Sequence, residues 1–174
     1  KFSRKEIDEL TNLAKTYGAK GLAYFTIESN SPTGTIVKFF KKEELSNIIE
    51  RTEAKEGDII FFGADSYETA CTALGHVRLA CADKFGLRDR NIFAFCWIYE
   101  FPLFEYSKEE KQLTASHHPF TSPRPEDAEL LEKNPEKVKA LAYDLALNGC
   151  EVAGGSIRIH QAEIQEKVFE LIGF

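Results

Sequence analysis

The sequence contains no methionine, not even at position 1, and its first residues, Lys1 and Phe2, resemble the interior of a chain. We therefore expect these 174 residues to be a piece of a longer protein. The sequence also lacks an apolar run near the ~20 residues that a membrane-spanning helix needs. It shows no signal peptide. We expect a cytoplasmic protein that does not enter a membrane.

Basic residues are outnumbered by acidic ones, with 22 Lys and Arg and 28 Asp and Glu, which gives a net charge of −6. Broad, non-specific binding to a nucleic-acid backbone needs a basic face, so we expect no DNA binding. Cysteine is limited to four residues with no CxxC pair, all in apolar contexts. This pattern favours reduced thiols in the core over zinc ligands or disulfides.

The segment that carries the chemistry lies near the end of the chain. Asn148-Gly149 separates two short apolar-rich runs and predicts a two-residue β-hairpin, because both turn positions need a positive φ. We predict that Ala146 faces Glu151 and that Asp144 faces Ala153. Side chains alternate along a strand, so these four residues share one face, with two carboxylates among alanines. The leucines and valine of the other face are predicted to form the core side.

Two carboxylates with small neighbours suit Mg²⁺ that arrives bound to a phosphate. Gly154-Gly155 follows and predicts a bulge or a close approach of another group. A bulge at the glycines would bring Arg158 to the carboxylate face, where its guanidinium could hold a carboxylate or phosphate with two hydrogen bonds. The alternative is a solvated acidic hairpin with an arginine countercharge, and spacing alone favours that alternative because structural ion pairs are common.

Two phrases, NGCEVAGGSIRIH at 148–160 and HHPFTSP at 117–123, resemble bacterial-type aspartyl-tRNA synthetases, which are class II enzymes. The spacing from His117 through Asp144 and Glu151 to Arg158 fits the family pattern without a gap. Ala153 replaces a glycine that is common there, which is a small change.

The resemblance implies roles for these positions. Arg158 would hold the L-aspartate substrate and His117 would belong to the amino-acid site. Glu151 would contact ATP, and Asp144 with Glu151 would serve Mg²⁺. No residue is implied as catalytic apart from substrate binding, and supporting positions are His118, Gly154, Gly155 and Ser156. Adjacent residues of an extended chain point in opposite directions, so only one of the two histidines can face a given pocket.

The first part of the chain, 1–88, resembles the insertion (GAD) domain of the same synthetases through KTYGAKGLAYF and GDIIFFGAD. That module also occurs in an archaeal tRNA-dependent amidotransferase family. We expect the module to be incomplete, with an exposed sheet edge. A charged break at 87–91 predicts the domain boundary, and 89–174 would be part of the catalytic domain without its second and third class motifs.

The predicted fold is α+β, with mainly antiparallel sheets and helices in both parts. Capping signals and apolar periodicity predict helices at 3–17, 41–51, 67–85, 126–133, 135–141 and 161–172. His160 would cap the last helix. We predict strands at 21–27, 35–40, 57–63 and 92–98, the last two buried, and a meander of antiparallel strands that runs from 92–98 to residue 116.

The resemblance implies an aspartate–tRNA ligase, dimeric at full length, that activates L-aspartate with ATP and transfers it to tRNA. The segment alone is expected to be inactive, because the arginines that hold the triphosphate would lie outside it. One alternative is a non-catalytic tRNA- or protein-binding module related to the amidotransferase domain. Another is a degenerate synthetase paralogue. The intact second half argues against both.

Overall fold

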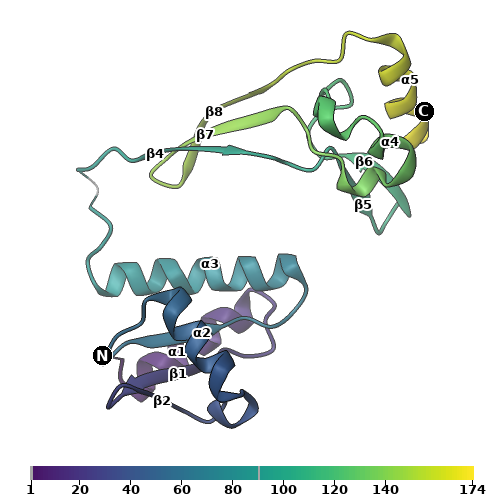
Figure 1. Cartoon of the computed structure of the whole chain (residues 1–174). Helices are drawn as coiled ribbons and strands as arrows, with labels where there is room; N and C mark the ends of the chain where they lie inside the picture. The colour runs from purple at the N-terminus through teal and green to yellow at the C-terminus, as the bar shows by residue number, and fades with distance from the viewer. Residues whose placement is uncertain (1, 90) are drawn as a thin grey trace. The chain divides into compact units, whose positions relative to one another are not determined.

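The computed structural model describes residues 2–89 and 91–174, which form two compact units, Lys1–Asp89 and Arg90–Phe174. Both units combine antiparallel sheets with helices, as an α+β fold requires (Figure 1). Within the described ranges, no helix is long and apolar enough to cross a membrane.

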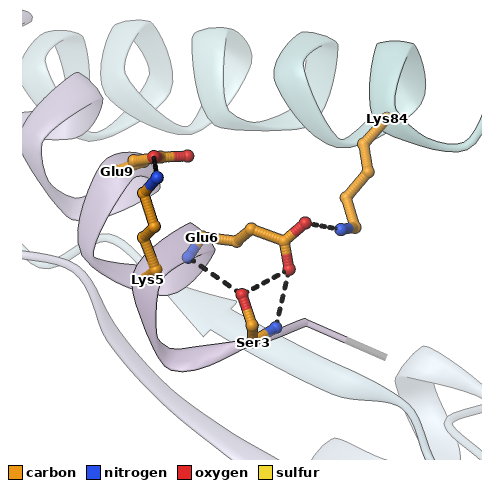
Figure 2. A network of polar contacts seen from close by, with 5 residues as sticks. All are labelled: Ser3, Lys5, Glu6, Glu9 and Lys84. Atoms are coloured by element: carbon orange, nitrogen blue, oxygen red, sulfur yellow. Dashed lines mark hydrogen bonds and ion pairs between the residues drawn. The ribbon is translucent and has the colours of Figure 1, made fainter.

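The first unit begins with helix α1 (Arg4–Thr16), whose start the sequence predicts correctly. Ser3 is the N-cap, its hydroxyl accepts from the Glu6 N–H, and the Glu6 carboxylate accepts from the Ser3 N–H at 2.7 Å. The same carboxylate forms an ion pair with Lys84 at the end of α3 (Tyr67–Lys84), so one side chain caps α1 and joins it to α3 (Figure 2). Together these contacts lower the pKa of Glu6 to about 2, the Lys84 bond being the largest cause.

The sheet of the first unit has the strand order β2-β1-β3 and is antiparallel throughout. Its strands are β1 (Ala23–Glu28), β2 (Ser31–Thr33) and β3 (Ile59–Phe62). The strand predicted at 35–40 is wrong: the chain there forms a 3₁₀ turn, Val37–Phe39, and β2 lies earlier. The strand predicted at 57–63 forms as β3, but the prediction that it is buried is wrong, because all four of its residues are half-buried. Among the described residues only β1 pairs with β3, which makes it an edge strand.

Helices pack against this sheet through two apolar clusters. One cluster joins α1 and α3 and includes Leu10, Ala14 and Val77. The other places Leu45 of α2 (Lys42–Thr52) against Phe25 and Ile27 of β1. Because these side chains recur on one face of each helix, the periodicity of the sequence predicts α1, α2 and α3 correctly.

The second unit contains the hairpin of interest within a three-stranded sheet of order β4-β7-β8. Strand β4 (Phe95–Tyr99) pairs with β7 (Ala142–Leu147), and β7 pairs with β8 (Cys150–Ser156), both antiparallel. Strands β5 (Phe104–Ser107) and β6 (Gln112–Ala115) form a separate two-stranded antiparallel sheet. The predicted meander is therefore confirmed for this pair and wrong for β4, which belongs to the other sheet. The prediction that β4 is buried on both faces is also wrong, because all five of its residues are exposed.

The core of the second unit lies away from the hairpin tip, where helix α5 (Ala162–Leu171) packs Val168 and Ile172 against Leu103, Phe104 and Val138. The predicted helix at 135–141 is only a 3₁₀ turn, Pro135–Lys137, because the chain then extends to pair Ala140 with Pro123. The region predicted as a helix at 126–133 divides into a 3₁₀ turn, Pro125–Asp127, and helix α4, Leu130–Lys133. Gln161, not His160, is the N-cap residue of α5.

The cysteines do not lie in the core as predicted. Cys71, Cys96 and Cys150 are exposed, and Cys81 is half-buried. Burial raises the pKa of the Cys81 thiol, which keeps that thiol protonated near neutral pH. All four are free thiols.

Candidate functional site

The site is built on the hairpin β7–β8, whose turn has the predicted geometry. Asn148 and Gly149 have φ of 51° and 84°, so both occupy the left-handed region that a two-residue turn needs. The Asn148 side chain also accepts from the Ala94 N–H at 2.9 Å and donates to the Ile92 carbonyl at 2.9 Å. The turn is therefore tied to the segment that leads into β4, a contact that local sequence reasoning did not predict.

The register of the hairpin is partly as predicted. Ala146 faces Glu151, but Asp144 faces Gly154 instead of Ala153, because Val152 has no partner on β7. This single extra residue is a β-bulge, and it lies two positions before the glycines where we predicted it. Ala153 consequently moves to the face opposite the carboxylates.

The two carboxylates converge above Gly154. A Cβ added to Gly154 would lie 2.6 Å from Asp144 Oδ1 and 3.1 Å from Glu151 Oε1. The two oxygens are therefore no farther apart than the sum of these distances. Any side chain at residue 154 would force the Asp144 carboxylate to move, which gives the predicted supporting role of Gly154 a physical basis.

The missing side chain of Gly155 leaves space on the opposite face of the same strand. A Cβ at Gly155 would lie 2.9 Å from the Tyr143 hydroxyl oxygen, because the Tyr143 ring crosses the strand there. The Tyr143 ring in turn packs edge-to-face on Trp97, with centroids 6.0 Å apart. Because neither glycine has a side chain, there is space for two carboxylates on one face of the strand and for an aromatic ring on the other.

The face opposite the carboxylates is not the buried core side that we predicted. Phe95 and Trp97 are about 60% exposed, and Tyr143 is 41% exposed. The buried residues of β7 are Ala142 and Ala146, which alternate onto the carboxylate face. The sequence pattern therefore separated the two faces near the turn correctly, but it predicted burial of the face opposite the carboxylates, whereas the buried residues of β7 lie on the carboxylate face.

Arg158 follows β8 on the side that carries the carboxylates. The bulge at Val152 puts Gly154 on that face, and two-residue alternation continues from Gly154 through Ser156 to Arg158. Arg158 forms an isolated bridge with Thr121, which is only 1% exposed. The Arg158 side chain is exposed, and no carboxylate among residues 2–89 and 91–174 forms an ion pair with it. Its guanidinium is therefore available to an outside anion.

The predicted HHPFT loop lies beside Arg158. The Ile159 N–H donates to the Phe120 carbonyl at 2.9 Å, and the Thr121 hydroxyl donates to the Ser156 hydroxyl at 3.5 Å. His118 Nδ1 accepts from the Phe120 N–H at 3.2 Å, so this ring nitrogen already has a hydrogen-bond partner within the loop. His117 is exposed and packs edge-to-face on Phe101, with centroids 4.6 Å apart, and no residue in 2–89 or 91–174 forms a hydrogen bond with its ring nitrogens.

Two features of this loop were not predicted from the sequence. The Gln165 side-chain amide donates to the Pro119 carbonyl at 3.0 Å, although the sequence indicated only a polar residue of the last helix. Ser116 Oγ is the one buried side-chain polar atom in the described ranges without a hydrogen-bond partner. Neither feature has a local sequence signal, because the contact joins distant segments and the burial of Ser116 depends on the folded chain.

The donor set at Gly154 fits Mg²⁺. Two carboxylates converge over a glycine cradle that a Cβ would fill, and hard oxygen ligands in this number are what Mg²⁺ takes from protein. Within the described residues no group of three or more His, Cys, Asp or Glu could hold a metal, so the remaining ligands would come from water or substrate.

Comparisons with known proteins find similar sequences for both halves of the chain. Residues 1–74 match the family model of the GAD domain. Aspartate–tRNA(Asp/Asn) ligase of Bacillus subtilis is 50% identical over 173 residues, 99% of this chain and 29% of the relative. That of Moorella thermoacetica is 51% identical over the same shares. Aspartate–tRNA ligase of Shouchella clausii is 47% identical over all of this chain and 30% of the relative.

The first 74 residues are thus similar to a GAD domain, and the similarity to aspartate–tRNA ligases extends over the rest of the chain. Over its whole length it is homologous to a segment of aspartate–tRNA ligases, and it spans about three-tenths of the length of these relatives.

Proposed function

We propose that this chain acts as part of an aspartate–tRNA ligase, which joins L-aspartate to ATP as aspartyl-adenylate and then passes the aspartyl group to tRNA. The observation that carries the proposal is the convergence of Asp144 and Glu151 over Gly154, with Arg158 on the same side of the strand. Identity near 50% over the whole chain supports it.

In this proposal, each side chain binds or orients a reactant. Arg158 holds the side-chain carboxylate of aspartate through a charge-assisted pair, which asparagine cannot match. His117 supports the amino acid from the neighbouring loop. Glu151 contacts ATP, and Asp144 and Glu151 are the residues that would hold Mg²⁺. When bound, Mg²⁺ would neutralise charge on the phosphates during displacement at the α-phosphate.

The two units have different roles in this proposal. Residues 89–174 supply part of the catalytic domain, and residues 1–88 supply an insertion domain without catalytic side chains. Because the chain spans only about three-tenths of the length of these relatives, we expect no activity from these 174 residues alone. We further propose that the full-length protein is a cytoplasmic homodimer.

The test is ATP–pyrophosphate exchange by the full-length protein that carries this segment. We expect exchange that depends on L-aspartate and is at least about 100-fold slower with L-asparagine, because asparagine lacks the anionic oxygen that Arg158 would bind. Exchange with neither amino acid would contradict the proposal and favour the binding-module or degenerate-paralogue hypothesis.

A further inference from the structure

The loop that carries His117 is held in place by helix α5. Phe120 packs edge-to-face on Phe169, with ring centroids 5.9 Å apart. One turn earlier on α5, the Gln165 Nε2 donates to the Pro119 carbonyl at 3.0 Å. α5 itself is fixed, because Val168 is only 1% exposed and belongs to the core of the second unit.

The Gln165 bond gives the Pro119 carbonyl a partner, and the carbonyls on either side of it also have one. The His118 carbonyl accepts from the Thr121 N–H, and the Phe120 carbonyl accepts from the Ile159 N–H, both at 2.9 Å. The Pro119 carbonyl lies between them and accepts from Gln165, a half-buried side chain. Losing that partner would free the backbone two residues after His117 to turn toward another donor.

We propose that Gln165 is a positioning residue: by holding the Pro119 carbonyl, it sets where the His117 imidazole lies for the amino-acid substrate. The role of His117 rests on the proposed function, whereas the anchoring of the loop rests on the contacts alone. Gln165 touches no reactant in this account and acts only through the loop.

The first arm of the test follows the imidazole signals of the 174-residue chain by NMR. The chain has four histidines, and His76 lies in the other unit, where it serves as an internal reference. Gln165→Leu removes the amide, and Gln165→Glu keeps its shape but places a carboxylate against the carbonyl. We expect both variants to shift the His117 and His118 signals and to leave His76 unchanged.

Glu166→Leu is the matched control, because Glu166 is the next residue of α5, is exposed and makes no hydrogen bond among the described residues. We expect its His117 and His118 signals to match those of the unsubstituted chain. Unchanged signals in both Gln165 variants, or equal shifts in the control, would overturn the proposal.

The second arm measures aspartate-dependent exchange in the full-length protein. Losing the positioning bond should raise KM for aspartate about 5-fold, while kcat and KM for ATP stay unchanged. A uniform loss of all three parameters, or an unchanged KM for aspartate, would overturn the proposal. If the unsubstituted protein shows no exchange, the proposed function fails, and the imidazole signals alone then decide whether Gln165 anchors the loop.

Discussion

Asp144 Oδ1 lies 2.6 Å from the position that a Cβ on Gly154 would occupy, directly across the β7–β8 ladder. Glu151 approaches the same point from its own strand at 3.1 Å. The absence of a side chain at residue 154 is therefore what allows two carboxylates to meet on one face of a narrow sheet.

Gly154→Ala should weaken divalent-cation binding. The added methyl group must push Asp144 away from Glu151, which separates the two ligands. We expect the Kd for Mn²⁺, measured by electron paramagnetic resonance as a probe of the Mg²⁺ site, to rise about 10-fold or more. Gly21→Ala is the control, because nothing lies within 4 Å of its added Cβ. Equal Mn²⁺ affinity in the Gly154 variant and the control would contradict the convergence of the carboxylates.

Gly155→Ala should change the opposite face of the sheet and leave the metal site alone. Its Cβ would lie 2.9 Å from the Tyr143 hydroxyl oxygen, so the ring must rotate away from Trp97. Trp97 is the only tryptophan of the chain, and its fluorescence reports on this contact directly. We expect a shift of the emission maximum with an unchanged Kd for Mn²⁺. The reverse pattern would show that the two faces are assigned wrongly.

Asn148→Gly should destabilise the second unit although glycine suits the turn. The substitution keeps the positive φ but removes the bonds to Ala94 and Ile92. We expect a loss of about 1–3 kcal/mol in the free energy of unfolding, measured with denaturant. Asn30→Gly is the matched control, because Asn30 has a φ of 57° and its side chain makes no hydrogen bond in the described ranges. Equal losses at the two positions would show that the Asn148 side-chain contacts contribute nothing.

The Glu6–Lys84 pair predicts acid sensitivity in the first unit. The folded pKa of Glu6, about 2, lies below its ordinary value of 4.5, so the ionised form is stabilised by folding. That stability is fully present above pH 4.5 and is lost as the pH falls toward 2. The difference in unfolding free energy between the unsubstituted chain and Glu6→Gln should therefore shrink across this interval.

The control for this titration is Glu9→Gln, which removes a carboxylate 3.8 Å from Lys5 on the exposed side of the same helix (Figure 2). The difference in unfolding free energy between the unsubstituted chain and Glu9→Gln should vary much less with pH. A Glu6→Gln difference that stays constant from pH 5 to pH 2 would contradict the lowered pKa.

Local patterns predicted much of this structure. The capping box at Ser3, the apolar stripes of α1 to α3 and α5, and the turn at Asn148-Gly149 each depend on neighbours in the sequence. The strand predicted at 35–40 and the helix predicted at 135–141 failed, because short apolar stretches do not separate helix, strand and turn. The first step of the meander failed for another reason: β4 pairs with β7, which lies more than forty residues later, although β5 and β6 pair as predicted.

At the site, the residue types were predicted and the detailed geometry was not. Asp144, Glu151 and Arg158 do share one side of the hairpin, but through a bulge at Val152 that no residue type signals. The roles of Gln165 and Tyr143 depend on partners from distant segments, Pro119 and Trp97. Such contacts become visible only when the chain is folded.

The measurement that tests the central claim most directly is aspartate-dependent ATP–pyrophosphate exchange by the full-length protein and its Arg158→Ala variant. Arg88→Ala is the control, because Arg88 belongs to the first unit, pairs with Asp83 there and is not one of the site residues. We expect strong exchange in the unsubstituted protein and the control, and kcat/KM for aspartate about 100-fold lower in Arg158→Ala. Exchange that survives in Arg158→Ala would contradict the assignment of Arg158 as the residue that binds the substrate carboxylate.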